Sequence, residues 1–500
     1  MSLWDGEERQ AAQALAALTF CNPFLGERMA LERRALGASF AASDAVWHAR
    51  DPLLPSPNLA ALAERAESLF RLARERRLSG RPILAEEREI LADLLLYILY
   101  QRFEPFFFGL LREGPRGVSA SFGRFAAEVA KLFDPELVSA ERRPEAAHLF
   151  ACFFQVRRAF HFIFSAIVGR SLPAARLRAA AWQSIFTHDL RRYQRSLFAL
   201  MGDFTTLIAG PSGTGKELVA RAIGLSRFIP FDAGAGSFAD SFEESFFPLN
   251  LSALSPTLIE SELFGHRRGS FTGAVADRIG WLELCPPLGT VFLDEIGEVE
   301  PAIQVKLLRV LETRTFTRLG ETRVRHFRGK VVAATNRDLA SELRAGRFRE
   351  DFYYRLCADT IATPTLAERL RDDPGELEDL VQNATRRLLG PEEAGRLAAE
   401  VVEYIGEFLP GYHWPGNVRE LGQCVRQILV RREYHPASLA AGSRVQAQDL
   451  AAELEAASLN AEELLRRYLR LVYAKTGSYV ATAKILGLDR RTVKAKLEPR

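Results

Sequence analysis

A glycine-rich segment at residues 210–216, GPSGTGK, has the residue types that hold a phosphate group. It follows an apolar run, TTLIAG, and precedes a helix pattern from Glu217 to Ile223, which is the strand, loop and helix order of a P-loop. The glycines let backbone N–H groups face a phosphate, and the Lys216 ammonium adds a point charge. Glu217 replaces the Ser or Thr that usually contacts Mg²⁺. A glycine turn without function is the alternative interpretation.

Two later apolar runs end in polar side chains suited to nucleotide hydrolysis. VFLDE ends in Asp294 and Glu295, which we expect to hold Mg²⁺ and to polarise the attacking water, respectively. VVAATN ends in Thr335 and Asn336, which are placed to orient that water or to sense the γ-phosphate. Ligands of an open α/β sheet bind where strands end, so these side chains should meet the P-loop. The expected cofactors are ATP and Mg²⁺, and the cofactor-binding candidates are Gly210, Pro211, Ser212, Gly213, Thr214, Gly215, Lys216, Glu217 and Asp294.

The elements that position these residues change in character along the chain. Residues before about 180 have helical periodicity and abundant Ala, Leu, Arg and Phe, whereas short β-type runs alternate with helical patterns after about 204. The pattern is helical again after about 364. We expect a multidomain chain: a helical domain at 1–180, an α/β P-loop core at 181–362, a helical lid at 363–435, a linker at 436–459 and an all-α helix-turn-helix at 460–500.

Composition excludes several classes of protein. The 500 residues are 48% hydrophobic and 26% charged, enough for two to four domains with cores. Five single cysteines without a CxxC pair indicate neither a zinc site nor a disulfide framework, and favour a reducing cytoplasm. No secretory signal pattern is recognised at the N-terminus. The apolar windows 94–111 and 148–169 are interrupted by Gln, Glu and Arg, so we expect buried helices and no membrane span.

The C-terminal residues 480–497 predict two short helices joined at Gly487. Apolar residues on both sides of that glycine allow the helices to pack, and Asp489 is a candidate N-cap for the second one. Basic side chains gather at the front of that helix, where a recognition helix meets double-stranded DNA in the major groove. A basic tail that binds nothing is the alternative. The DNA-binding candidates are Arg490, Arg491, Thr492 and Lys494.

Residues 260–274, ESELFGHRRGSFTGA, resemble the ESELFGH…GAFTGA signature of the bacterial enhancer-binding proteins, AAA+ ATPases that activate sigma-54 RNA polymerase. The match differs by Ser270 in place of Ala. GPSGTGKE is similar to the family's GESGTGKE, which accounts for Glu217. The resemblance covers roughly residues 200–432 and the C-terminal segment, which resembles a Fis-type helix-turn-helix. Two segments depart from the family pattern: DAGAGSFADSFEESF at 232–246 and PTLAERLRDDPGEL at 364–377.

The resemblance implies roles for individual residues. Asn250 matches the family's partner of the catalytic glutamate, and Arg349 and Arg355 match its arginine fingers, which reach a neighbouring subunit's ATP. Arg419, in WPGNVREL, matches the second sensor of the lid. The catalytic candidates are therefore Glu295, Asn250, Thr335, Asn336, Arg349, Arg355 and Arg419. The implied sigma-contact loop consists of Gly269, Ser270, Phe271, Thr272, Gly273 and Ala274, with Phe271 and Thr272 as contact residues.

The resemblance also implies an activity: a cytoplasmic homo-oligomer, a hexameric ring with a dimer as its resting form, hydrolyses ATP to remodel the sigma-54 RNA polymerase holoenzyme. Its helix-turn-helix would bind upstream DNA. Two alternatives stay open: an AAA+ remodeller of another protein, and a DNA-binding regulator with little ATP turnover. We expect residues 1–180 to be a regulatory or sensor domain without a phosphorelay receiver pattern. Its aromatic residues at 106–108 and 150–164 are expected in a core, with a ligand pocket as the alternative.

Overall fold

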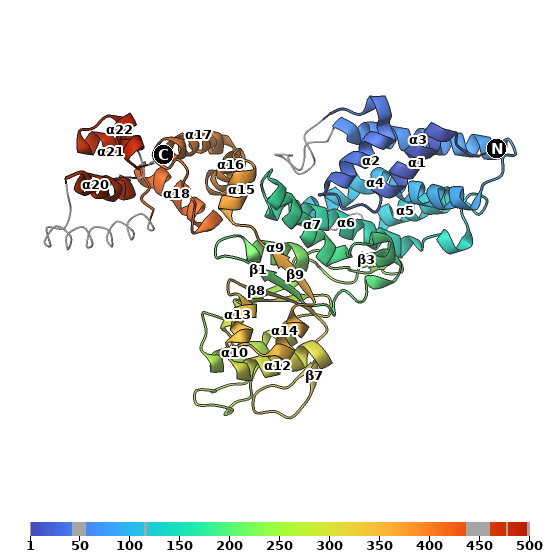
Figure 1. The fold of residues 1–500 in the computed structure, drawn as a ribbon. Helices are drawn as coiled ribbons and strands as arrows, with labels where there is room; N and C mark the ends of the chain where they lie inside the picture. Colours follow the sequence, from blue (N-terminus) through green and yellow to red (C-terminus); the bar gives the residue numbers. More distant parts are fainter. Residues whose placement is uncertain (1, 43–56, 115–117, 437–460, 477–478, 498–500) are drawn as a thin grey trace. The chain divides into compact units, whose positions relative to one another are not determined.

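The computed structural model describes residues 2–42, 57–114, 118–436, 461–476 and 479–497 (Figure 1). These residues form two compact units. The first contains Met1–Pro211 and Gly215–Pro364, and the second contains Ser212–Thr214 and Thr365–Arg500. The tip of the predicted P-loop is therefore grouped with the second unit, while the rest of that loop belongs to the first.

The first unit begins with a helical region that extends beyond residue 180. Helix α7 crosses the boundary expected from the sequence, and a short helix and a π-helical turn follow it before the first strand. The helices are α1 Gly6–Leu18, α2 Gly26–Leu36, α3 Pro57–Leu78, α4 Ala85–Glu113, α5 Val118–Leu132, α6 Ala146–Ala166, α7 Leu172–Phe186 and α8 Leu190–Arg192, and the turn is η4 Tyr193–Leu197.

Aromatic side chains form the centre of this helical region. The ring centroids of Phe107 and Phe150 lie 5.1 Å apart, and those of Phe125 and Phe150 lie 5.2 Å apart. Helix α4 is long and apolar enough to cross a membrane by length and composition alone. In the structure, Leu94 and Leu95 of α4 are buried in the same core as these rings. Burial against other helices accounts for the apolar sequence of α4.

A five-stranded parallel sheet follows, with the order β4-β5-β8-β1-β9. Helices and short hairpins connect the strands, as the alternation in the sequence predicts. The strands are β1 Thr206–Ala209, β4 Phe246–Asn250, β5 Thr290–Asp294, β8 Lys330–Thr335 and β9 Asp359–Ala362. The other elements include α9 Lys216–Gly224, β2 Phe231–Asp232, β3 Ser237–Phe238, α10 Pro256–Phe264, α11 Trp281–Leu284, α12 Pro301–Thr313, β6 Thr315–Phe316, β7 Arg325–His326, α13 Leu339–Arg344 and α14 Glu350–Leu356.

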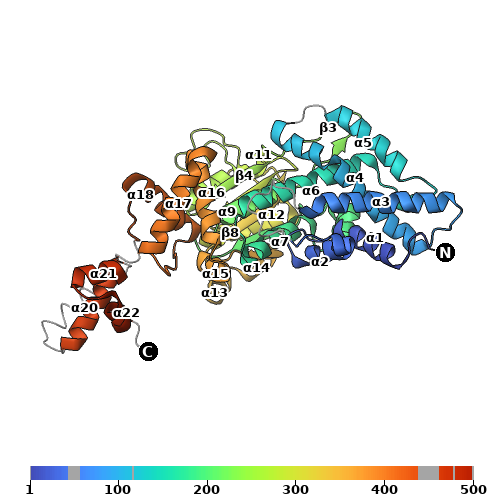
Figure 2. The same ribbon diagram turned by 90° about the horizontal axis from the view of Figure 1, so that it is seen from above.

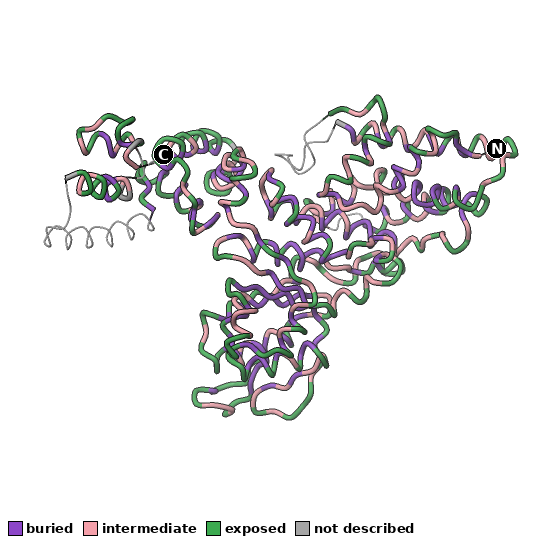
Figure 3. Tube along the Cα trace, viewed as in Figure 1, coloured by how far each residue is buried: buried purple, intermediate pink, exposed green. Residues whose placement is uncertain are grey.

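The two faces of this sheet pack against different sets of helices, which lie on opposite sides of the strands in Figure 1 and overlap the sheet in Figure 2. Leu207, Val291 and Val331 face a core built with α10, α12 and α14. Alternate residues such as Ile208 and Val332 face a second core, which contains α9 together with α6 and α7 of the helical region. The central strands β5, β8 and β1 are accordingly buried along nearly their whole length, whereas the edge strands β4 and β9 are partly exposed (Figure 3). The helical region thus covers one face of the sheet rather than forming a separate body.

The segment at 232–246, which departs from the family pattern, also contributes to the contact between the helical region and the sheet domain. Strands β2 and β3 pair as a hairpin. The Phe231 ring lies 4.6 Å from that of Phe122 and 4.9 Å from that of Phe150, and the Phe238 ring lies 4.7 Å from that of Phe154. The insertion therefore extends the sheet domain into the aromatic core of the helical region.

The second unit is helical among its described residues. Its helices are α15 Leu366–Asp372, α16 Glu376–Leu389, α17 Pro391–Phe408, α18 Asn417–Arg431, α20 Ala461–Thr476, α21 Tyr479–Leu486 and α22 Arg490–Leu497. The unusual segment at 364–377 folds regularly, because Thr365 and Glu368 form a capping box for α15. A buried ion pair joins Arg369 to Glu376. Nearly all of the expected linker at 436–459 lies outside the described residues.

Candidate functional site

The loop between β1 and α9 has the backbone geometry of a phosphate cradle. Gly210 and Gly215 have φ values of +152° and +94°, and a Cβ at Gly210 would lie 2.2 Å from the Thr363 hydroxyl oxygen. Lys216 is 7% exposed, and its Nζ donates to the carbonyls of Gly210 at 2.9 Å and Pro211 at 3.2 Å. Helix α9 begins at Lys216, so its first N–H groups are available to an anion. Glu217 is exposed at the same turn.

The ends of β5 and β8 bring two candidate catalytic residues together. Asp294 is the last residue of β5, and Glu295 follows it with a left-handed φ of +55°. The Asp294 carboxylate accepts a hydrogen bond from the Glu295 N–H at 3.1 Å, and the Glu295 carboxylate accepts one from the Asn336 N–H at 3.1 Å. A non-glycine residue in this region costs of order 1–3 kcal/mol, which is typical of functional sites. Thr335 is buried, and its hydroxyl accepts from the Arg337 N–H at 3.1 Å.

Asn250 lies at the same edge of the sheet, where its side chain bonds to Ser252. It ends β4 in register with Asp294 of β5. Its side-chain oxygen accepts from the N–H and the hydroxyl of Ser252, at 3.0 and 2.8 Å. The structure therefore places Asn250 beside the strand that carries Asp294, while the Glu295 carboxylate is held by Asn336.

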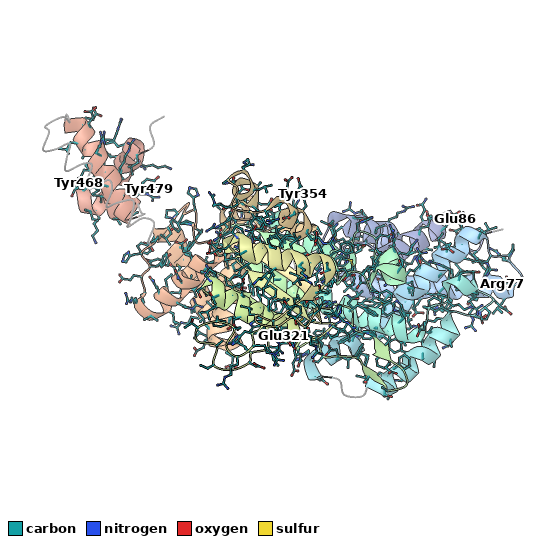
Figure 4. The ribbon with its side chains drawn as sticks, turned by 90° about the horizontal axis from the view of Figure 1, so that it is seen from below. Arg77, Glu86, Glu321, Tyr354, Tyr468 and Tyr479 are labelled. Carbon is teal, nitrogen blue, oxygen red and sulfur yellow. The ribbon has the colours of Figure 1, made fainter. Side chains whose placement is uncertain are left out.

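Arg349 and Arg355 lie at the two ends of α14. Arg349 is the exposed N-cap residue, and its guanidinium makes two bonds to Asp351, at 3.0 and 2.6 Å. Arg355 donates twice to the Leu311 carbonyl, at 3.2 and 3.1 Å. The neighbouring Tyr354 is 67% exposed (Figure 4). This end of the domain therefore presents charged and aromatic side chains to solvent.

In the second unit, the tip of the P-loop packs against the start of α18. Asn417 donates from its side chain to the Ser212 carbonyl at 2.9 Å, and Arg419 donates to the Ser212 hydroxyl at 2.8 Å. A Cβ at Gly213 would lie 2.3 Å from the Gly416 carbonyl oxygen. Thr214 is buried in this unit. The structure thus brings the candidate sensor Arg419 to the three loop residues 212–214.

The predicted sigma-contact loop is a tight turn with an exposed tip. The Gly269 N–H donates to the Ala274 carbonyl at 2.8 Å, and Gly269 and Gly273 both have positive φ. Phe271 is half-buried against His266, with ring centroids 4.9 Å apart, so its ring packs on its own loop. Thr272 is exposed at the tip.

Ser270 differs from the rest of this loop. Its hydroxyl oxygen is buried and has no hydrogen-bond partner among the described residues. Gly320 lies against it, since a Cβ on that glycine would come within 2.8 Å of the Ser270 Cβ. At the base of the loop, Arg267 forms ion pairs with Asp277 and with Glu321, the latter labelled in Figure 4. These contacts fix the base while the tip remains accessible.

The C-terminal helices α20, α21 and α22 share a small core. Leu469, Ala483 and Val493 are buried, and Leu486, Leu488 and Leu497 pack against them. Asp489 accepts from the Arg491 N–H at 2.7 Å, and α22 begins at the next residue, as the sequence predicts for an N-cap. Gly487 has a φ of +65°. All four DNA-binding candidates are exposed on α22: Arg490, Arg491, Thr492 and Lys494.

Sequence reasoning missed the polar residues that join the helical region to the sheet. Arg158 is fully buried in α6 and donates to the carbonyls of Leu225, at 3.1 Å, and Arg227, at 2.6 Å. Gln155 donates to the Ser226 carbonyl at 2.9 Å. These carbonyls lie at the C-terminal end of α9, the helix that begins at the P-loop lysine. The available signal was Arg158 itself, a charge within an otherwise apolar helix.

Comparisons with known proteins bear on this geometry. A family model described as the Sigma-54 interaction domain matches residues 188–362. The transcriptional regulatory protein ZraR of Salmonella typhimurium is 33% identical over 341 residues, which cover 66% of this chain and 71% of that protein. The chain belongs to the sigma-54-dependent transcriptional activators. Its AAA+ P-loop core, with a parallel sheet and helical flanks, is the fold that the sequence predicts for such an activator.

Two other activators match over a shorter part of their length. The hydrogenase transcriptional regulatory protein HoxA of Bradyrhizobium diazoefficiens is 46% identical over 228 residues, covering 46% of this chain and 43% of that protein. The Nif-specific regulatory protein of Azotobacter vinelandii is 43% identical over 229 residues, covering 46% of this chain and 40% of that protein. The matched segment of this sigma-54-dependent activator thus spans under half the length of those relatives.

Proposed function

We propose that this protein is a cytoplasmic ATPase that binds upstream DNA and remodels the sigma-54 RNA polymerase holoenzyme at promoters. The observation that carries the proposal is the presence, in one sheet domain, of a P-loop lysine, a strand-end acidic pair and the ESELFGHRRGSFTGA loop. The first two suit ATP hydrolysis, and the third is the family's contact with the sigma factor. A homo-oligomeric ring, hexameric when active and dimeric at rest, is the assembly proposed.

The residues of the P-loop and the end of β5 fit a nucleoside triphosphate and Mg²⁺. Lys216 and the first turn of α9 supply positive charge, and Asp294 supplies a carboxylate oxygen of the kind that Mg²⁺ prefers. Bound Mg²⁺ would neutralise charge that develops on the phosphate oxygens. The exposed Glu217 takes the place of the usual hydroxyl, so Asp294 is the direct protein candidate for holding the metal.

The strand-end residues act on the attacking water. Glu295 accepts a proton from that water, and its contact with the Asn336 N–H fixes the direction of the carboxylate. Asn250 and Thr335 orient the same region from the adjoining strand ends. Arg349 and Arg355 donate to the γ-phosphate of a neighbouring subunit, for which Arg349 exchanges its bonds with Asp351. Arg419 senses the nucleotide through the loop tip.

The exposed turn and the C-terminal helices give the ATPase its targets. Residues 269–274 contact the sigma factor through Thr272 and through Phe271, which leaves its packing on His266 to do so. Helix α22 enters the major groove with its exposed basic residues. Residues before β1 act as the regulatory or sensor domain, because their helices contact α9 directly.

A pair of variants in one loop tests this function. Thr272→Ala should leave ATP hydrolysis and ring formation unchanged but abolish sigma-54 binding and open-promoter formation, because Thr272 is exposed at the tip of a loop that carries none of the candidate ATP-site residues. Ser270→Ala is the matched control. It removes a buried hydroxyl that has no partner among the described residues, so activity and stability should be retained.

Promoter opening by Thr272→Ala at the wild-type rate would contradict the sigma-contact role and favour a remodeller of another protein. Lys216→Ala distinguishes the proposed function from the remaining alternative, because the proposed function requires this variant to lose both ATP hydrolysis and promoter opening. If Lys216→Ala still opened promoters, the protein would be a DNA-binding regulator that needs little ATP turnover.

A further inference from the structure

A cavity of about 240 Å³ lies within the first unit, where the helical region meets the sheet. Gln155, Ser184 and Tyr193 line it from the helical side, and Ile223 and Lys330 line it from the sheet side. Lys330 is the first residue of β8, whereas Asn336 follows the other end of that strand. At about 3.3 Å per strand residue, the cavity is separated from the ATP-site residues by the length of the sheet.

Two cations line this cavity, the buried Lys330 and the half-buried Arg227, and neither has a carboxylate within ion-pair distance among the described residues. Lys330 is 3% exposed, and its Nζ donates to the carbonyls of Phe204, at 2.8 Å, and Met201, at 3.3 Å. The Arg227 guanidinium donates to the carbonyls of Gly289 and of Pro287, the latter at 3.3 Å. Neither cation forms a salt bridge within the described part of the chain. Carbonyl dipoles satisfy their donors but do not neutralise their charge.

The surrounding charges leave an excess of positive charge. Arg314 is paired with Asp203 at 3.0 Å, and Asp359 accepts a hydrogen bond from the Thr206 hydroxyl at 3.2 Å. Burial lowers the pKa of Lys330 to about 7, with Arg227 and Arg314 lowering it further and Asp359 opposing them. Burial also lowers the pKa of Arg227 to about 10. An anion in the cavity would offset the cost of burying these cations.

The other walls are apolar and set the size of the ligand. Among them are Ile185, Ile223, Phe198, Phe228 and Leu288. A dry cavity of about 150 Å³ can hold benzene, so 240 Å³ has room for one ring or a branched chain that carries a carboxylate. We propose that this cavity binds a small organic monocarboxylate with an aromatic or branched aliphatic body, whose carboxylate pairs with Lys330 and Arg227.

The position of the cavity makes the ligand a regulator of the ATPase, a consequence that rests on the proposed function. Gln155 lines the cavity, bonds to Tyr193 at 2.7 Å and bonds to the Ser226 carbonyl at 2.9 Å. Ile223 and Arg227 lie near the C-terminal end of α9, and Lys216 begins that helix. Occupancy therefore acts on the P-loop helix at the end opposite the phosphate cradle.

Binding is tested on the full chain without ATP, so the result does not depend on turnover. The probes are benzoate and isovalerate, compared with benzamide and isovaleramide, which have similar shapes but no charge. Calorimetry should show the amides binding roughly tenfold to a hundredfold more weakly, the range expected when a charged hydrogen bond is lost. Equal affinity for acids and amides, or no binding of the acids at millimolar concentration, would overturn the proposal.

Two further experiments test whether the carboxylate binds in this cavity. Lys330→Met should abolish carboxylate binding, whereas Lys131→Met, at an exposed site on α5, should retain it. In the wild-type protein, affinity for benzoate should fall as the pH rises from 6 to 9, because Lys330 loses its proton. The other charged groups that face Lys330 or its neighbours are Arg227, Arg314, Asp203 and Asp359. Unchanged binding by Lys330→Met, a flat pH profile, or binding of inorganic phosphate as tight as that of benzoate would each contradict the assignment.

Discussion

Lys330→Met should change how the stability of the protein depends on pH. Burial lowers the pKa of this amine from 10.5 to about 7 in the folded protein. Between these two values the unfolded chain binds more protons than the folded one, so the free energy of unfolding rises with pH across that window. Below about pH 7 both states hold the proton, and the full cost of burying the ammonium is present. Methionine has no proton to lose and should lack this dependence.

The size of the effect follows from the two pKa values. A drop from 10.5 to about 7 corresponds to about 5 kcal/mol between the acidic and basic limits. The slope reaches about 1.4 kcal/mol per pH unit, which is roughly 2 °C of melting temperature per pH unit for a unit as large as the one that contains Lys330. The variant also loses the bonds to the Met201 and Phe204 carbonyls. That loss is a constant offset, so the slope is the quantity to compare.

Melting temperatures of the full chain, recorded by near-ultraviolet circular dichroism from pH 6 to 9 in buffer without carboxylates, provide the measurement. The wild-type curve should rise relative to that of Lys330→Met, and the exposed control Lys131→Met should follow the wild type. Parallel curves for wild type and Lys330→Met would refute the argument, because they would mean that folding does not lower the pKa of Lys330.

Four other changes have defined outcomes. Glu295→Gln should retain ATP binding but lower turnover by roughly 10²- to 10⁴-fold, since it removes the group that accepts the proton; hydrolysis within about tenfold of wild type would count against this role. ATPase activity should rise faster than linearly with protein concentration, and mixing Arg349→Ala with Lys216→Ala subunits should restore some activity at mixed interfaces, whereas verified mixed rings without rescue would exclude a shared site. Arg490→Ala should weaken binding to the proper DNA site more than binding to random DNA, and equal losses would mean that the exposed Arg490 contacts only phosphate. Arg158→Met should lower the melting temperature by several degrees, because each buried carbonyl that loses its donor costs about 1–3 kcal/mol. The exposed control Arg143→Met should have no effect, and a similar loss in both variants would mean that the Arg158 hydrogen bonds do not hold the helical region to the sheet.

The chain order of the ATP-site residues could be predicted because each motif is local. An apolar strand followed directly by glycines or carboxylates places those residues at the carboxyl edge of the sheet, whatever the rest of the chain does. The partners of the side chains could not be predicted in the same way. Asn250 bonds to Ser252 and Glu295 bonds to the Asn336 N–H, and both contacts depend on strand register and turn geometry.

The extent of the helical region could not be predicted from the sequence either. Helical periodicity shows that α6 and α7 have apolar faces but does not show what covers them. In the structure that cover is one face of the sheet, reached through residues such as Ile208 and Val332. The burial of Lys330 could not be predicted for a similar reason. A lysine at the start of a strand is usually solvated, and this one is buried because the loop before β1 supplies the Met201 and Phe204 carbonyls to its ammonium.

The way α6 and α7 cover the sheet changes what a truncation experiment can report. Removing residues 1–200 would expose apolar side chains of the core that the sheet and α9 share with α6 and α7, including Ile208, Phe292 and Ile361, together with Phe231 and Phe238 of the hairpin. Exposed surfaces of this kind drive self-association. Loss of activity in such a fragment would reflect poor solubility as readily as the loss of a signal. Point changes at polar positions such as Gln155 can uncouple the two regions while leaving that surface covered.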